Sequence, residues 1–106
     1  MNKHQAMIEA CLACFAACEV CATECIKMVN EDHLKCITHC RDCAEICMIC
    51  VKFASRGSAY SKQVMQLCTE ICNACAAECE KFADEHDHCR KCAEACRKCA
   101  EECSAY

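Results

Sequence analysis

Cysteine accounts for 19 of the 106 residues, and the cysteines follow a regular spacing. Within each of four groups the steps alternate between three and four residues: Cys11, Cys14, Cys18, Cys21 and Cys25; Cys36, Cys40, Cys43, Cys47 and Cys50; Cys68, Cys72, Cys75 and Cys79; Cys89, Cys92, Cys96, Cys99 and Cys103. Such steps place residues on one face of an α-helix, so the spacing predicts four helices, each carrying a row of sulfur atoms. Because thiolates are soft ligands that bind Cu(I), Zn(II) and iron–sulfur clusters, the rows predict a metal-binding protein in which all 19 cysteines are ligands.

The rest of the sequence favours the helices that these rows require. Proline is absent and glycine occurs once, whereas Ala, Glu, Lys and Met, all good helix formers, are common. We predict helices over residues 3–28, 32–55, 59–83 and 87–104.

Three segments without cysteine separate the predicted helices. Asn30-Glu31-Asp32 offers N-cap residues for the second helix. Ser55-Arg56-Gly57-Ser58 predicts a helix stop at Gly57, followed by a new cap. The acidic turn from Asp84 to Asp87 can cap the fourth helix and suits its positive N-terminal end.

Short connections make sequential helices antiparallel, so we predict one all-α domain over residues 1–106 with up-down-up-down four-helix-bundle topology. The cysteine rows of such a bundle face its central axis, and the core is lined with sulfur. Free cysteine also serves as a small buried apolar residue. Four rows of it argue against that simpler interpretation, because aliphatic side chains pack better and do not oxidise.

Disulfide bonds are the first alternative to metal binding. The cysteine count is odd, and the first residues lack the pattern of a secretory or twin-arginine signal, so we expect a cytoplasmic protein with reduced thiols. A mature chain after signal removal would look the same. Cysteines one turn apart have Cβ atoms about 5–6 Å apart, whereas a disulfide needs about 3.5–4.5 Å. Pairing within a helix is therefore disfavoured, while pairing across the bundle stays open.

The charge and hydropathy of the chain disfavour two classes of partner. A formal net charge of −4 does not suit nucleic acid, which selects basic surfaces. No uninterrupted apolar run approaches the roughly 20 residues that span a bilayer. We therefore expect neither nucleic acid nor a membrane as a partner.

Among the soft metals, Cu(I) suits continuous rows of sulfur best. Metal–sulfur bonds of about 2.3 Å place two sulfurs about 4.6 Å apart across a linear ion, which Cys-x-x-x-Cys on one helix can supply. The eight such pairs are Cys14 with Cys18, Cys21 with Cys25, Cys36 with Cys40, Cys43 with Cys47, Cys68 with Cys72, Cys75 with Cys79, Cys92 with Cys96, and Cys99 with Cys103. If each thiolate bridges two ions, the capacity approaches roughly one ion per cysteine.

Three alternatives stay open beside Cu(I) storage. A zinc or mixed-metal thiolate buffer would use separate four-ligand sites. An iron–sulfur electron carrier would normally carry its cysteines on loops, in a proline-containing motif that this sequence lacks. A cysteine beside a histidine, such as Cys89 after His88 or Cys40 after His39, could be an activated nucleophile. No third orienting residue accompanies either pair, so we expect no enzyme.

The whole pattern resembles the four-helix-bundle copper storage proteins, in the cytosolic branch without a twin-arginine signal. The stretch from His86 to Cys103 carries the resemblance most specifically, and Cys43–Cys47 and Cys72–Cys79 are similar. The resemblance implies a homotetramer in which each bundle stores many Cu(I) ions, with Cys-x-x-x-Cys pairs as principal ligands. We interpret the protein as a store that buffers and detoxifies copper, for which a copper donor or acceptor is a possible partner. The third group departs from it, since Met65 takes the place of a fifth cysteine and puts one site near that end in doubt.

The residues beyond the rows suggest how copper enters. His33, His86 and His88 gather at one predicted end, and we interpret them as a metal entrance surrounded by acidic residues that attract cations; the alternative is a solvated loop with helix caps. Met7, Met28 and Met65 are either ligands or plugs that fill the ends. His39 lies off the rows and is interpreted as structural.

A second apolar stripe on the first three helices predicts self-association. Its members are Ile8, Leu12, Phe15, Ala22 and Ile26; Leu34, Ile37, Ala44, Ile46, Met48, Ile49, Val51 and Phe53; and Tyr60, Val64, Leu67, Ile71 and Ala74. The outer face of the fourth helix is charged instead. We therefore expect a homo-oligomer that buries the first three helices and exposes the fourth to water.

Overall fold

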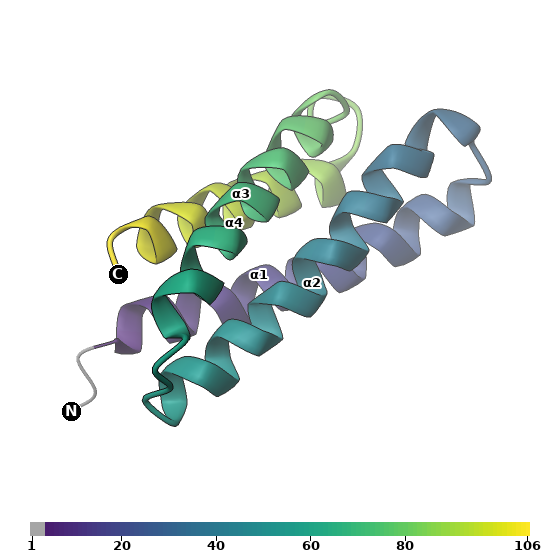
Figure 1. Cartoon of the computed structure of the whole chain (residues 1–106). Coiled ribbons are helices and arrows are strands. Elements are labelled where there is room, and N and C mark those ends of the chain that lie inside the picture. The colour runs from purple at the N-terminus through teal and green to yellow at the C-terminus, as the bar shows by residue number, and fades with distance from the viewer. Residues whose placement is uncertain (1–3) are drawn as a thin grey trace.

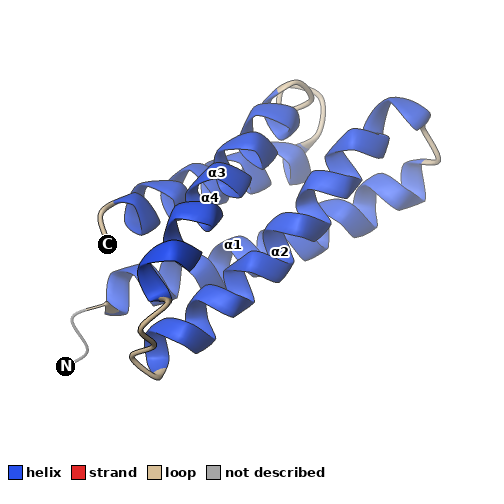
Figure 2. Cartoon of the chain, in the orientation of Figure 1, coloured by secondary structure: helices blue, strands red, loops and turns tan. Residues whose placement is uncertain are grey.

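The computed structural model describes residues 4–106, and this part of the chain is helical without strands. Its elements, drawn in Figure 1 and Figure 2, are α1 (Gln5–Met28), the short 3-10 helix η1 (Glu31–His33), α2 (Leu34–Ser55), α3 (Ser61–Glu80) and α4 (Asp87–Ser104). The four predicted α-helices are therefore confirmed. The predicted start of the first helix, at residue 3, lies outside the described residues.

The helices form an antiparallel bundle with up-down-up-down topology, as predicted. Each helix packs against two neighbours, α1 and α3 both lying between α2 and α4. The α1–α2 and α3–α4 connections lie at one end of the bundle, whereas the α2–α3 connection and the C-terminus lie at the other (Figure 1). The described chain measures 41 × 18 × 17 Å, so the interior enclosed by the four helices is long and narrow.

Two of the predicted breaks have capping hydrogen bonds. The Asn30 side chain accepts a hydrogen bond of 2.9 Å from the backbone N–H of Asp32. It thereby caps η1 rather than α2, whose N-cap residue His33 makes no side-chain capping bond. Gly57 has a positive φ of 64°, its N–H donates to the carbonyl of Ala54, and the N–H of Ser58 donates to the carbonyl of Phe53. This pair of bonds is a Schellman motif, which ends α2 and explains why the single glycine of the chain lies here.

The α3–α4 connection differs from the prediction. α3 ends at Glu80 rather than at residue 83, and the N–H of Phe82 donates to the carbonyl of Cys79, three residues back. Residues 81–85 therefore form tight turns, which bring the chain back within a shorter distance than an extra helical turn would allow. Asp87 lies in the first turn of α4, where its charge was expected, but His86 is the N-cap residue and makes no side-chain capping bond.

Val29, which follows α1, adopts a conformation that the sequence did not suggest. Its φ of 50° and ψ of 47° are left-handed, which costs a β-branched residue roughly 1–2 kcal/mol. Its side chain is 90% exposed, so a substitution loses little packing. We expect Val29→Gly to raise the free energy of unfolding of the reduced protein by about 0.5–1 kcal/mol, after the greater freedom of glycine in the unfolded chain is subtracted. Urea unfolding followed by circular dichroism measures this change.

The control for that substitution is Val29→Ala, which shortens the side chain but keeps the left-handed strain. A gain from alanine equal to the gain from glycine would contradict the backbone explanation and point to the removal of an exposed apolar side chain instead.

α1 also differs from the expectation about membranes. By length and composition alone this helix could cross a membrane, with a mean hydropathy of 1.7. α1 has no long uninterrupted apolar run, but its many Cys and Ala residues raise its mean hydropathy. Helices in the core of a bundle share this composition. The cysteines of α1 all face the other three helices and are buried.

The core of the bundle is built of sulfur, as predicted. Every cysteine is at most 2% exposed. Small alanines such as Ala44, Ala76 and Ala93 fill the space beside the rows, and Ile46 is the one larger aliphatic residue that is fully part of the core of the described chain. The aliphatic packing that normally stabilises a bundle is therefore replaced by thiol contacts.

The outer surface divides as expected between apolar and charged faces. Seven members of the predicted apolar stripe are exposed: Leu12, Ile26, Leu34, Ile49, Tyr60, Leu67 and Ala74. Ala22, Ala44 and Ile46 belong to the core instead, because their positions flank the cysteine rows closely. The face that α4 turns outward is charged.

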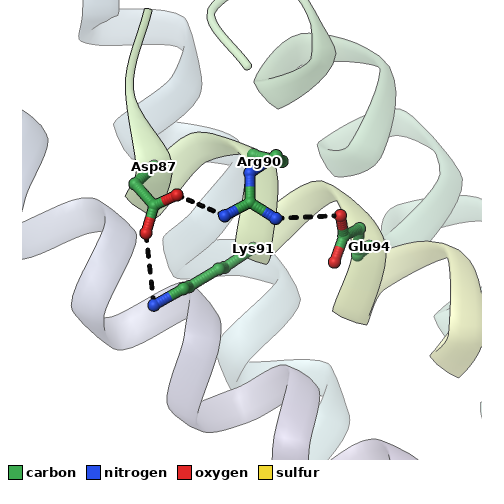
Figure 3. Close-up of polar contacts among 4 residues, drawn as sticks. All are labelled: Asp87, Arg90, Lys91 and Glu94. Carbon is green, nitrogen blue, oxygen red and sulfur yellow. Dashed lines mark hydrogen bonds and ion pairs between the residues drawn. The ribbon is translucent and has the colours of Figure 1, made fainter. Parts of the chain in front are cut away.

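Ion pairs cover the exposed face of α4. Figure 3 shows the Arg90 guanidinium between the carboxylates of Asp87 and Glu94, while the Lys91 ammonium contacts the second oxygen of Asp87 at 3.2 Å. The Arg90 guanidinium lowers the pKa of Asp87. Farther along α4, Arg97 forms a two-pronged pair with Glu80 of α3, at 2.8 and 3.0 Å. The Arg97–Glu80 pair thus joins α4 to α3, whereas the other pairs lie within α4 and keep its outer face charged.

Candidate metal centre

The four rows of cysteine form one continuous tube along the bundle axis, which we call the sulfur tube. All 19 predicted ligands are free thiols and buried. Within the tube, sets of donor atoms lie within 4.8 Å of one another: Cys11, Cys68, Cys99 and Cys103; Cys14, Cys47, Cys72 and Cys99; Cys14, Cys18, Cys43 and Cys96; Cys18, Cys40, Cys75 and Cys92. Because Cys14, Cys18 and Cys99 each belong to two sets, the sets are not separate sites.

The sulfur–sulfur distances show which coordination the tube can supply. Four of the predicted Cys-x-x-x-Cys pairs have sulfur atoms in contact: Cys68 with Cys72 at 3.6 Å, Cys92 with Cys96 at 3.9 Å, and Cys14 with Cys18 and Cys99 with Cys103 at 4.0 Å. Three ligands around one ion with bonds of about 2.3 Å lie about 4.0 Å apart, whereas two ligands across a linear ion lie about 4.6 Å apart. The pairs therefore suit three-coordinate binding as they stand, and linear binding needs a small rotamer change.

Contacts between helices are as short as those within helices. The sulfur of Cys43 on α2 lies 3.4 Å from that of Cys72 on α3, and Cys36 lies 3.5 Å from Cys79. Cys14 on α1 lies 3.6 Å from both Cys43 and Cys96. The sequence predicted that the rows face one another but could not assign these partners. An ion in the tube can thus take sulfur ligands from two or three helices.

Hydrogen bonds between thiols separate the pKa values of neighbouring cysteines. The contact between Cys14 and Cys18 lowers the pKa of Cys14 and raises that of Cys18. Nearer the end of the tube, burial raises the pKa of Cys25 to about 11 and that of Cys89 to about 12. These thiols are protonated at neutral pH, so a metal that binds them must displace their protons.

The predicted entrance residues do lie together, at the end of the bundle with the α1–α2 and α3–α4 connections; we call this the histidine end. His33 Nδ1 and His88 Nε2 each lie 3.5 Å from the sulfur of Cys25. The His86 ring lies 5.2 Å from that of His33 and 5.4 Å from that of His88. Burial, and the positive potential of His86, lower the pKa of His88, which favours the neutral form that ligates metals.

One candidate ligand set at this end mixes imidazole with thiol. His88 groups with Cys21, Cys25 and Cys89, all four donor atoms within 4.8 Å of one another. The sequence placed His88 beside Cys89 but carried no signal for its contact with Cys25, which comes from a different helix. His33 is only 2% exposed and stacks on Phe82 with ring centroids 4.0 Å apart. His39, on α2, lies off the cysteine rows and is half-buried.

The opposite end of the bundle, with the α2–α3 connection, is closed by a second group of side chains. Met7 and Met65 are buried, as are Ser61 and Ala54, and the His4 ring lies 4.5 Å from that of Tyr106. Met28, at the histidine end, is half-buried. The two ends of the tube therefore differ in the buried side chains that close them: the His33 imidazole at one end, and the Met7 and Met65 thioethers at the other.

This chain is similar to known proteins by family, by sequence and by structure. The family model described as copper storage protein matches residues 1–106. An uncharacterized cysteine-rich protein, YhjQ of Bacillus subtilis (strain 168), is 45% identical over 90 residues, which are 84% of this chain and 82% of the relative.

Two solved structures show the same fold with related sequences. The Cu(I)-bound copper storage protein BsCsp3 superposes with a TM-score of 0.89 at 44% identity, covering 95% of this chain and 94% of the other. A cytosolic copper storage protein from Streptomyces lividans, loaded with five coppers, superposes with a TM-score of 0.88 at 38% identity, covering 96% of this chain and 89% of the other.

Proposed function

This chain belongs to the copper storage protein family, and we propose that its sulfur tube holds many Cu(I) ions at once, with all 19 cysteines as ligands. The observation that carries the proposal is the sharing of sulfur atoms: Cys14, Cys18 and Cys99 each take part in two four-sulfur sets. Sharing lets one thiolate bridge two ions, so the capacity exceeds that of isolated four-cysteine sites. Copper storage is binding and release without a catalytic step, and we assign no reaction to the chain.

The decisive experiment is an anaerobic titration of the reduced protein with Cu(I) against a chromophoric competitor. We expect well over ten tightly bound ions per chain. Four or fewer ions would mean isolated sites and would favour the zinc buffer; brown colour with visible absorption in the purified protein would favour iron–sulfur clusters.

Two further proposals concern where the protein works in the cell and how it assembles. We propose a cytoplasmic protein, supported by 19 thiols that need a reducing compartment and by the likeness to a relative described as cytosolic. We propose a homotetramer, supported by exposed apolar residues such as Leu12, Leu34 and Leu67 on α1 to α3. A copper donor or acceptor would then exchange ions at an exposed end of the bundle. Sedimentation of a monomer would contradict the assembly.

We propose that copper enters at the histidine end. His33 and His88 both contact Cys25, which begins the tube at that end. Glu31, Asp32, Asp84, Glu85 and Asp87 are exposed around it and attract cations. We expect the triple substitution of His33, His86 and His88 by Ala to slow Cu(I) loading about tenfold or more while leaving the final ion count within about two of the wild type. Stopped-flow loading from a chromophoric Cu(I) complex measures both.

The control for that variant is His39→Ala, which removes a half-buried imidazole of α2 that lies off the cysteine rows; it is expected to load at the wild-type rate. Loading by the triple variant at the wild-type rate would reject the entrance.

A further inference from the structure

The end of the bundle opposite the histidines carries an unexplained sulfur contact. We call it the methionine end, after Met7 on α1 and Met65 on α3, which are 4% and 1% exposed. The thiol of Cys11 lies 3.7 Å from the thioether sulfur of Met7, one helical turn before it. A residue that only plugged the end would present any apolar surface, whereas here the thioether sulfur is aimed at the first sulfur of the α1 row.

Cys11 links this thioether to the tube. Its sulfur lies 3.7 Å from that of Cys103 and 3.6 Å from that of Cys99, both on α4. These spacings are close to the roughly 4.0 Å that separates three sulfurs around one ion with bonds of about 2.3 Å. We propose that Met7, Cys11 and Cys103 form a mixed thioether–thiolate Cu(I) site, and that this site gives up its ion before the all-thiolate tube does.

The row of α3 is one thiol short at the methionine end, while Cys11 and Cys103 also belong to a four-thiol set with Cys68 and Cys99. The Met7 thioether therefore adds a ligand on the outer side of that set. Met65 occupies the position one step before Cys68, where the other rows have a fifth cysteine. The thiol of Cys50 donates to the carbonyl of Val64 at 3.8 Å. A thioether is soft enough for Cu(I) but is neutral, so it completes the coordination without the charge attraction of a thiolate. The ion held by Met7 is therefore bound less tightly than the ions inside.

The surface at this end gives an outside ligand a path to the site. A cavity of about 220 Å³ is lined by Met65, Cys103 and Tyr106, among others. An incoming chelator or thiolate can form its bond to Cu(I) as the Met7 sulfur leaves, and the thiols of Cys11 and Cys103 regain protons from water as the ion departs. Copper stays monovalent throughout, so the exchange needs no electron donor or acceptor.

The proposal rests on the proposed function, because it assumes that the tube binds Cu(I), and its test is designed to separate the two. The whole chain is labelled with ¹³C at the methionine methyls and titrated anaerobically with Cu(I), which is diamagnetic. We expect the Met7 methyl resonance to shift as ions bind, while those of Met28 and Met48 stay near their original positions. Single Met→Leu variants assign the resonances.

Release kinetics supply the second measurement. Fully loaded protein is mixed with excess bicinchoninic acid, a chromophoric Cu(I) chelator. We expect a fast phase of about one ion per chain in the wild type, and loss of that phase in Met7→Leu, a substitution of similar volume. Met28→Leu, at the histidine end, keeps the fast phase.

The outcomes point to different conclusions. An unmoved Met7 resonance, or an unchanged fast phase in Met7→Leu, in protein that still loads more than ten ions overturns the methionine site and leaves storage intact. Four or fewer ions in the wild type overturns the storage function itself.

Discussion

Full loading with Cu(I) is expected to raise the melting temperature of the protein by at least about 30 °C. A ligand present at 1,000 times its dissociation constant stabilises the folded state by about 4 kcal/mol per independent site, and 1 kcal/mol moves the melting temperature of a domain of this size by about 4 °C. Three such sites already suffice. The physical reason lies in the core, where 19 buried thiols take the place of aliphatic side chains. These thiols form metal–sulfur bonds only when Cu(I) is bound. Anaerobic thermal melts followed by circular dichroism measure the difference.

The control for this measurement is reversal. Stripping the loaded protein with excess chelator should return the melting temperature to that of the reduced, metal-free chain. A loaded protein that melts within a few degrees of the metal-free one would mean that copper binds the unfolded chain about as well as the folded bundle, and the tube would then not be pre-arranged for its cargo.

Removing a central sulfur is expected to cost more copper than removing one at the end. The Cys96 sulfur lies within 4.0 Å of those of Cys14, Cys18, Cys43 and Cys92. The thiol of Cys50 instead contacts a backbone carbonyl. Because a central thiolate bridges neighbouring ions, Cys96→Ala should lower the capacity by about two ions per chain and Cys50→Ala by at most about one. Competitive Cu(I) titration of both variants gives the counts.

The two alanine variants are matched, since both remove one fully buried thiol from a helix of the bundle. Equal helicity by circular dichroism shows that both fold. An equal loss of ions from the two would indicate that each cysteine contributes independently, and bridging would be rejected.

Local sequence patterns were sufficient to predict the helices and the face that each one buries. The alternation of three and four residues between cysteines is a property of a single helix, so it predicted the burial of every sulfur without knowledge of its partners. The ends of the helices follow local rules in the same way: Asn30 caps η1 through its side chain, and Gly57 supplies the positive φ that closes α2. The early end of α3 and the strained Val29 escaped prediction, because both depend on how the chain must turn to reach the next helix.

The sequence by itself determined that this protein has four rows of buried sulfur, with His33, His86 and His88 gathered at one end. Only the tertiary structure decided which sulfurs meet: Cys43 with Cys72 at 3.4 Å, and Cys25 with the rings of His33 and His88. Periodicity specifies the buried face of a helix, but the axial offset between two helices is set by side-chain packing and loop length. That offset determines the distances between sulfurs, and so the coordination that the tube can offer to Cu(I).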